Sequence, residues 1–91
     1  MHTVYVLYSE KYDKLYIGYT HDLINRFRFH QTLATKGYTI RYRPWKIIHT
    51  EHFETKENAL LREKQLKGGQ GRQWLRGNIL PLMKSVGFIS A

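Results

Sequence analysis

The sequence predicts a small α+β domain in which a three-stranded antiparallel sheet is flanked by helices. Three observations lead to this class. Short β-branched and aromatic segments are interleaved with longer segments of helical character, in the order β-β-α-β-α-α. A short polar turn separates the first two strand segments, which favours an antiparallel hairpin. The chain has 91 residues, enough for one core, so we expect a single domain over residues 1–91.

The first two strands and a helix occupy the N-terminal third of the sequence. TVYVLYS at 3–9 and LYIGY at 15–19 are rich in the β-branched and aromatic residues that strands prefer. Thr20 is a suitable N-cap for the helix that follows, and Asp22 is favourable in the first turn. We expect this helix to run to about Leu33.

The hairpin register determines which tyrosines share a face. If Tyr8 pairs with Leu15 beside the turn, Tyr5 lies opposite Gly18, and Tyr16 lies on the same face as Tyr5. Gly18 would then leave space between the two hydroxyl groups. The hairpin therefore predicts a paired-tyrosine surface.

A loop and a third strand follow. ATKGYTIRYRP at 34–44 is polar, basic and interrupted by glycine and proline, which indicates a loop with room for a short helical turn. WKIIHTEHF at 45–53 fits a strand. The last five residues, 87–91, are expected to form a tail.

The C-terminal half is predicted to be helical. Thr55 can cap a helix over 56–67, which the glycines at 68 and 69 would end. A further helical segment covers 71–86, and we expect a break near Pro81 because proline cannot donate a backbone hydrogen bond.

Charge and composition limit the function classes. Fifteen Lys and Arg residues against seven Asp and Glu residues give a net charge of +8, which favours DNA or RNA as a partner. The alternative is a basic protein with no specific polyanionic partner. There is no cysteine, which excludes disulfides and thiolate metal sites. We find neither an apolar stretch of about 18 residues nor a signal peptide, so we expect a cytoplasmic protein that does not bind a membrane.

A carboxylate on the apolar side of the helix at 56–67 is the sharpest anomaly. Ala59, Leu60 and Leu66 define one arc, and Glu63 falls near its middle. An ionised carboxylate is costly on a buried face unless a cation, a metal or a donor compensates it. Glu63 is therefore a candidate functional carboxylate. The alternative is a structural pair with Lys67, one turn later.

The first helix carries two polar candidates. Leu23, Ile24 and Phe27 form its predicted apolar side, and Arg26 and His30, one turn apart, flank that side. Arginine can bind a phosphate through two hydrogen bonds, and imidazole can exchange a proton near neutral pH. The alternative is a solvated basic rim that only meets a DNA backbone.

Packing is the other interpretation of the tyrosines. Aromatic residues on strands usually pack, so this alternative stays open for Tyr5 and Tyr16. We assign Tyr8, Tyr12 and Tyr19 to packing.

Taken in order, these residues resemble the GIY-YIG nuclease domain. The matching elements are TVY at 3–5, YIG at 16–18, then Arg26 and His30, and a helix-borne Glu63 within REKQLK. The family retains the tyrosine of its first motif, so TVY in place of GIY is a minor departure. The resemblance is to small stand-alone bacterial proteins, whose domain also occurs in the excision-repair nuclease UvrC and in intron-homing endonucleases.

This resemblance implies a GIY-YIG endonuclease fold and a metal-dependent phosphodiesterase that acts on DNA, in repair or processing. In the family one divalent cation, Mg²⁺ or Mn²⁺, binds the glutamate, here Glu63. Tyr5 would activate the attacking water and Tyr16 would assist. Arg26 would supply positive charge to the tyrosine and the phosphate, and His30 would share in proton handling.

Other residues are candidates for substrate binding. Many family members choose DNA with a second domain, so a protein partner is a candidate source of specificity for this chain. The alternative function is a nucleic-acid-binding module that retains the fold with little or no catalysis. A third interpretation is that all these residues are structural.

Asn78 is a candidate for the polar residue that the family often places late in its site. The expected phosphate-binding residues are Lys36, Arg41, Arg43, Lys46, Lys67 and Arg72, joined by Lys64 and Arg76.

Overall fold

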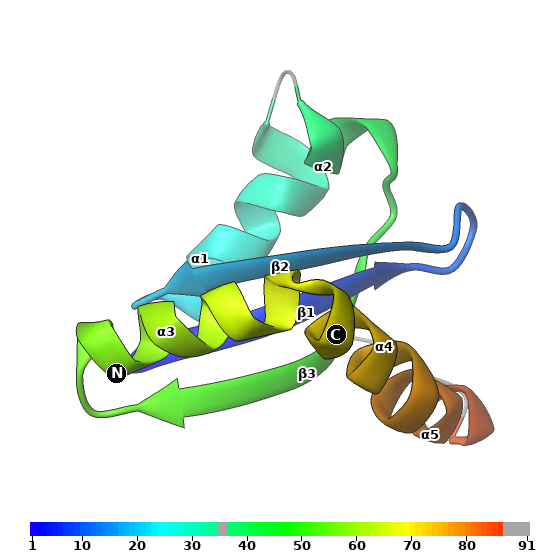
Figure 1. The fold of residues 1–91 in the computed structure, drawn as a ribbon. Coiled ribbons are helices and arrows are strands. Elements are labelled where there is room, and N and C mark those ends of the chain that lie inside the picture. Colours follow the sequence, from blue (N-terminus) through cyan, green and yellow to red (C-terminus); the bar gives the residue numbers. More distant parts are fainter. Residues whose placement is uncertain (35–36, 87–91) are drawn as a thin grey trace.

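The computed structural model describes residues 1–34 and 37–86, and its main elements follow the order β-β-α-β-α-α (Figure 1). The predicted class is confirmed, since a three-stranded antiparallel sheet lies between helices. The expected phosphate ligand Lys36 and the expected tail at 87–91 lie outside the described residues. Within the described residues, none of the helices is long and apolar enough to cross a bilayer.

The sheet has the strand order β2-β1-β3. Strand β1 covers His2–Ser9, β2 covers Lys14–Thr20 and β3 covers Lys46–Phe53. Strand β1 is therefore central and β2 forms one edge of the sheet, where the candidate site is built.

The predicted hairpin register is confirmed. Tyr8 pairs with Leu15 and Tyr5 pairs with Gly18. A Cβ atom on residue 18 would overlap the hydroxyl and ring of Tyr5, so only glycine fits beneath that tyrosine in this arrangement. The register places Tyr16 on the same face as Tyr5.

Alternation along β1 divides the core into two layers. Val4, Val6 and Tyr8 face helix α3, Lys56–Lys67, whereas Tyr5 and Leu7 face the opposite layer. In Figure 1, α3 lies in front of the strands and α1 behind them. The second layer contains α1, Leu23–Arg28, the π-helix η1, Phe29–Leu33, and the short α2, Tyr38–Arg41.

The N-cap predicted for the first helix was wrong. Strand β2 continues to Thr20, so α1 begins later and Asp22 is the N-cap, with Oδ1 accepting a hydrogen bond of 3.3 Å from the amide of Asn25. The Thr20 hydroxyl instead accepts a hydrogen bond of 3.0 Å from the amide of Asp22. The second predicted cap is confirmed, because Thr55 accepts from the amide of Asn58 at 3.2 Å.

Two residues assigned to apolar helix faces are exposed. Ile24 is 81% exposed on α1, where Leu23 and Phe27 supply the packing contacts, and Leu60 is 40% exposed on α3. Both helices meet the sheet along a stripe narrower than the sequence pattern predicts.

The C-terminal helical segment is not broken at Pro81. Helix α4, Gly69–Trp74, runs into the π-helix η2, Leu75–Ile79, and then into α5, Leu80–Ser85. Proline lies in the first turn of α5, where a missing N–H is tolerated. The irregularity therefore precedes the proline and takes the form of a wider helical turn.

Candidate active site

Four of the predicted catalytic residues lie together on the α1 side of the sheet. Tyr5 comes from β1, Tyr16 from β2, Arg26 from α1 and His30 from η1. The Tyr5 hydroxyl and His30 Nε2 are 2.8 Å apart, and the rings of Tyr16 and His30 have centroids 4.6 Å apart. The Arg26 guanidinium interacts with both tyrosine hydroxyls. The hairpin register and the first helix together assemble this cluster.

Burial sets the ionisation of the Tyr5–His30 pair. Burial raises the pKa of Tyr5, with a further rise from Tyr16, while Arg26 acts in the opposite direction. Burial also lowers the pKa of His30 to about 4, assisted by the positive charges of Arg26 and Arg43. Both partners are therefore neutral at neutral pH, and the hydrogen bond between them joins two uncharged groups.

The backbone around His30 is held by Arg43. Its Nε donates to the carbonyl of His30 at 2.6 Å, and its terminal nitrogen donates to the carbonyls of Ala34 at 3.1 Å and Phe29 at 3.4 Å. These carbonyls lie at the end of the helix, where backbone acceptors lack partners within the helix, and that of Phe29 also accepts from the amide of Ala34 at 2.9 Å. The predicted phosphate ligand Arg43 thus has its donors directed at the chain.

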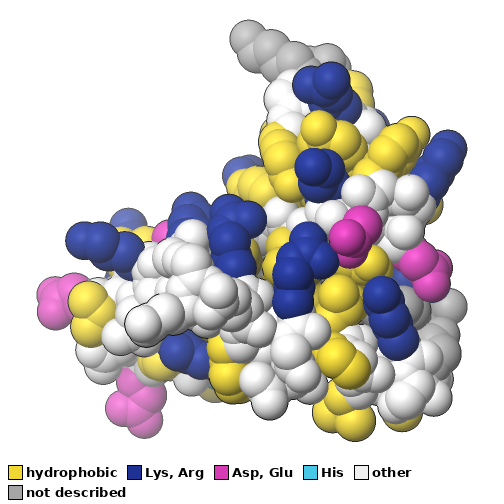
Figure 2. Space-filling view, turned by 45° about the vertical axis from the view of Figure 1, so that its right-hand side comes forward, with side chains coloured by type: hydrophobic (Ala, Val, Ile, Leu, Met, Phe, Trp, Pro, Cys, Tyr) yellow, Lys and Arg dark blue, Asp and Glu magenta, His cyan; other side chains and the backbone are white. Residues whose placement is uncertain are grey.

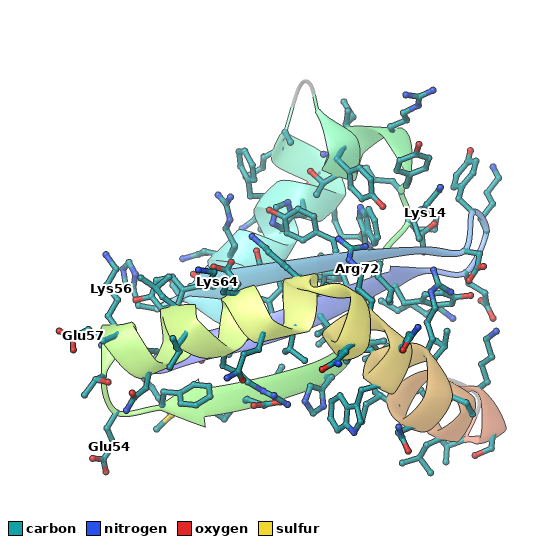
Figure 3. All side chains as sticks on the ribbon, in the orientation of Figure 1. Lys14, Glu54, Lys56, Glu57, Lys64 and Arg72 are labelled. Atoms are coloured by element: carbon teal, nitrogen blue, oxygen red, sulfur yellow. The ribbon has the colours of Figure 1, made fainter. Side chains whose placement is uncertain are left out.

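A hollow of about 230 Å³ opens beside Tyr16 along the edge formed by β2. Figure 3 labels Arg72 on this side of α3. Figure 2, which brings the right-hand side of Figure 1 forward, shows Lys and Arg side chains grouped around hydrophobic ones. The hollow has apolar strand residues beneath and two cations at its rim. Its lining consists of Leu15, Tyr16, Ile17, Tyr38, Lys67 and Arg72.

Glu63 lies on α3, beside this hollow. Its side chain is 19% exposed and pairs with the Lys67 ammonium at 3.4 Å. Among the described residues, the structure records no direct contact between Glu63 and the tyrosine cluster. Glu63 is linked to the tyrosines only through the hollow, because its partner Lys67 lines the hollow together with Tyr16. The pair of Glu63 with Lys67, which the sequence offered as the structural alternative, is thus present, and its carboxylate is half-buried.

The donor set suits a cation that keeps most of its water. In the part of the chain that the structure describes, no three His, Asp or Glu side chains group closely enough to hold a metal. Mg²⁺ binds through one or two carboxylates and the phosphates of its substrate. The ion pair of Glu63 is longer than a strong charge-assisted hydrogen bond, so the carboxylate can exchange Lys67 for a metal. Glu63 fits this role.

The remaining predicted residues lie outside the cluster. Lys46 pairs with Glu10 at 3.3 Å, and Arg41 lies over the ring of Tyr42, 5.6 Å from its centroid. Asn78 lies on η2, with its amide donating to a backbone carbonyl one turn earlier. Among the described residues, the structure records no contact of Arg41 or Asn78 with the cluster of Tyr5, Tyr16, Arg26 and His30.

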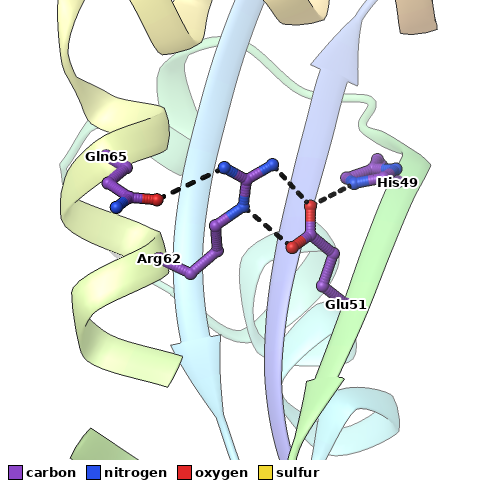
Figure 4. Close-up of polar contacts among 4 residues, drawn as sticks. All are labelled: His49, Glu51, Arg62 and Gln65. Atoms are coloured by element: carbon purple, nitrogen blue, oxygen red, sulfur yellow. Dashed lines mark hydrogen bonds and ion pairs between the residues drawn. The ribbon is translucent and has the colours of Figure 1, made fainter. Parts of the chain in front are cut away.

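A polar cluster on the other side of α3 was not anticipated (Figure 4). Arg62 donates to both oxygens of Glu51, at 2.8 and 3.1 Å, and His49 contacts the same carboxylate at 2.7 Å. The guanidinium also lies 5.4 Å from the ring centroid of Trp74. Burial alone would raise the pKa of Glu51. The hydrogen bonds from Arg62 and His49 outweigh this effect and hold that pKa below its usual value. This cluster ties β3 to α3.

Sequence reasoning also missed Tyr38. It lines the hollow, stacks with Trp45 at 5.9 Å and donates to the carbonyl of Leu15 at 3.2 Å. In the sequence, Tyr38 is only a tyrosine within a basic loop, and the sequence does not indicate where that loop folds relative to the sheet.

Comparison with known proteins places these features in a family. The model of the GIY-YIG catalytic domain matches residues 1–75. A UPF0213 protein from Limosilactobacillus reuteri is 39% identical over 72 residues, covering 77% of this chain and 74% of that protein. A UPF0213 protein from Bacillus velezensis is 39% identical over 66 residues, covering 72% of this chain and 66% of the relative.

A solved structure shows the same fold. The solution NMR structure of a UPF0213 protein from Bacillus halodurans aligns with a TM-score of 0.57 and 24% identity, covering 99% of this chain and 98% of that one. The family match extends over β1 to the end of α4 and therefore includes the tyrosine cluster and Glu63. The chain belongs to the GIY-YIG family of nucleases.

Proposed function

We propose that this protein is a metal-dependent DNA endonuclease that hydrolyses phosphodiester bonds at the cluster of Tyr5, Tyr16, Arg26, His30 and Glu63. The observation that carries the proposal is the placement of a buried tyrosine–histidine pair beside a cationic hollow and a half-buried carboxylate. A structural role alone gives no reason to gather an arginine, two tyrosines and a histidine there.

The proton acceptor is the Tyr5–His30 pair. Tyr5 is neutral in the free protein, so it can take a proton from water only as its own proton moves to His30 Nε2, 2.8 Å away. His30 is available for this transfer because it is neutral above about pH 4. Its Nδ1 is buried and has no hydrogen-bond partner among the described residues, so only Nε2 takes part in the exchange.

The other residues hold the substrate. Arg26 is exposed and lies against both tyrosines, where it can donate to a phosphate and stabilise the charge that develops on it. Tyr16 lines the hollow and orients the phosphate from the side of β2, while Gly18 makes room for Tyr5. Glu63 would hold one Mg²⁺ or Mn²⁺ ion, which supplies Lewis-acid stabilisation of the phosphate when bound.

Cations beyond the cluster would bind the DNA backbone. Lys67 and Arg72 at the rim of the hollow, with Lys64 nearby on α3, are the strongest candidates for phosphate contacts (Figure 3). Contacts of this kind give affinity without sequence selectivity. A role in DNA repair or processing, a protein partner that supplies specificity and a cytoplasmic location stay predictions.

The test is cleavage of supercoiled plasmid and branched DNA in the presence of Mg²⁺ or Mn²⁺. We expect cutting by the wild type and loss of at least about 100-fold in Glu63→Gln and Arg26→Ala, since each removes a group that stabilises the transition state. Glu57→Gln is the matched control, because Glu57 is exposed on the same helix. DNA binding without metal-dependent cutting by the wild type would refute catalysis and support the binding-module alternative.

A further inference from the structure

Three tyrosines form an aromatic surface where the β1–β2 hairpin meets α2. Tyr12 lies in the hairpin turn, Tyr38 in α2 and Tyr42 just after α2. Ring centroids are 5.5 Å apart for Tyr12 and Tyr42 and 4.8 Å apart for Tyr38 and Tyr42, both edge to face. Tyr12 and Tyr38 are each 42% exposed. We call Tyr12, Tyr38 and Tyr42 the tyrosine surface.

The tyrosine surface is continuous with the hollow. Tyr38 and Tyr16 both line the hollow, with ring centroids 6.2 Å apart. Tyr16 lies in turn 6.2 Å from the ring of Tyr5. A series of aromatic rings therefore leads from the exposed hairpin turn to the buried Tyr5–His30 pair.

Cations lie over the rings of the tyrosine surface. The Lys11 ammonium lies 5.3 Å from the ring centroid of Tyr12, and Lys14 and Arg41 lie 5.4 and 5.6 Å from that of Tyr42. Figure 3 shows Lys14 beside the hairpin, along the same strand edge as Arg72. The surface thus combines partly exposed aromatic rings with flexible cationic side chains that lie over them.

Nearby carboxylates do not cancel this charge. Glu10 is engaged with Lys46 at 3.3 Å, and Asp13 with Arg76 at 2.9 Å. Aromatic faces combined with a cationic border are the features with which proteins bind unpaired nucleic acid, because bases stack on the rings while phosphates meet the cations. In duplex DNA the base faces are already stacked on one another and cannot reach such rings.

We propose that the tyrosine surface binds an unpaired DNA strand by base stacking and leads it into the hollow. This rests on the proposed endonuclease function for the cleavage step, but not for the binding step. Lys11 and Arg41 move off the rings of Tyr12 and Tyr42 to contact phosphates, which frees the ring faces for bases, and Tyr38 passes the strand to Tyr16. The substrate class is then DNA with unpaired nucleotides next to the phosphate that is cut.

The experiment measures fluorescence anisotropy of a labelled single-stranded oligothymidine and of a duplex of equal length, with EDTA present so that nothing is cleaved. We expect tighter binding of the single strand. Tyr12→Ala should weaken single-strand binding by roughly 5- to 100-fold, the range for loss of one stacked base, and Tyr12→Phe should retain it. Tyr12 lies exposed in a turn, so the substitution is compatible with folding, which circular dichroism checks.

Trp74→Leu is the matched control, because Trp74 is 38% exposed but contacts His49 and Arg62 instead of the tyrosine surface. It should leave single-strand binding unchanged. Equal affinity of the wild type and Tyr12→Ala, or preference of the wild type for the duplex, would overturn the proposal. Because the assay contains no metal, its result is independent of whether the cleavage test succeeds, and the two proposals can fail separately.

Discussion

The hydroxyl of Tyr5 and Nε2 of His30 lie 2.8 Å apart, with both residues almost completely buried. Neither group is charged at neutral pH, because burial raises the pKa of Tyr5 and lowers that of His30. Both shifts oppose transfer of the Tyr5 proton to His30, so the transfer proposed for catalysis depends on positive charge beside the tyrosine, which Arg26 supplies. The pair also affects folding, since the native state must keep the imidazole neutral.

The stability of the protein should depend on pH through His30. Its pKa is about 4 in the folded protein, against an ordinary value near 6.5, so between these values the unfolded chain binds a proton that the native chain does not. The free energy of unfolding should therefore fall as the pH falls from 7 to 4, by about 3 kcal/mol from this residue. Urea denaturation at several pH values measures the slope.

His30→Gln should flatten this pH dependence, because glutamine does not titrate. His21→Gln is the control, since His21 is exposed, and it should leave the slope unchanged. An unchanged slope in His30→Gln would contradict the neutral buried imidazole.

Gly18→Ala should displace Tyr5 and break its bond to His30. The new methyl group would overlap the Tyr5 hydroxyl and ring, and overpacking of this kind costs about 1–3 kcal/mol. We expect lower stability and loss of DNA cleavage. Gly77→Ala has open space around its Cβ on η2 and should be neutral or stabilising by up to about 1 kcal/mol. Equal stability of the two variants, with activity retained in Gly18→Ala, would show that Tyr5 is not held as described.

Glu51→Gln should destabilise the protein by about 1–3 kcal/mol, because the half-buried guanidinium of Arg62 would keep its charge without its bidentate carboxylate partner. The pKa of Glu51 is lowered, so the contribution is present above the ordinary carboxylate pKa and is lost as the pH falls through the lowered value. Urea denaturation at pH 7 gives the difference. Glu10→Gln serves as the comparison, because the Glu10 carboxylate, which pairs with Lys46, is 58% exposed. This substitution should lower the free energy of unfolding by less than about 0.5 kcal/mol.

The sequence was sufficient to predict the sheet and the tyrosine cluster. Alternation in β1 and β2, together with a short turn, leaves one register that buries the apolar face, and that register places Tyr5 above Gly18. Helical spacing then brings Arg26 and His30 to the same side. These relationships are local in the chain or follow from one strand pairing, so a pattern of residues specifies them.

Contacts between distant segments could not be predicted in this way. The pairing of Glu51 with Arg62 depends on the angle at which α3 crosses β3, and the position of Tyr38 depends on the path of the loop before it. The burial assigned to Ile24 failed for a similar reason, since six-residue α1 packs on the sheet along too narrow a stripe to cover that position. Helix periodicity gives the direction of a side chain but not the width of the contact.

Lys67 and a metal ion should compete for Glu63. The ammonium and the carboxylate are 3.4 Å apart on the same face of α3, and such i,i+4 pairs contribute about 0.2–0.5 kcal/mol. Lys67→Gln removes both this pair and a positive charge that repels the metal. We expect Mn²⁺ affinity without DNA to rise roughly two- to fivefold in isothermal titration. DNA affinity in EDTA should fall instead, because Lys67 also lines the hollow.

The opposite signs of these two effects distinguish competition from a general loss of structure, which would weaken both. Lys64→Gln supplies the control, since Lys64 is exposed on α3 and the ion pair of Glu63 is with Lys67. It should lower DNA affinity to some extent and leave Mn²⁺ affinity nearly unchanged. Weaker Mn²⁺ binding in Lys67→Gln would mean that the ammonium orients the carboxylate for the metal, and the competition described here would be refuted.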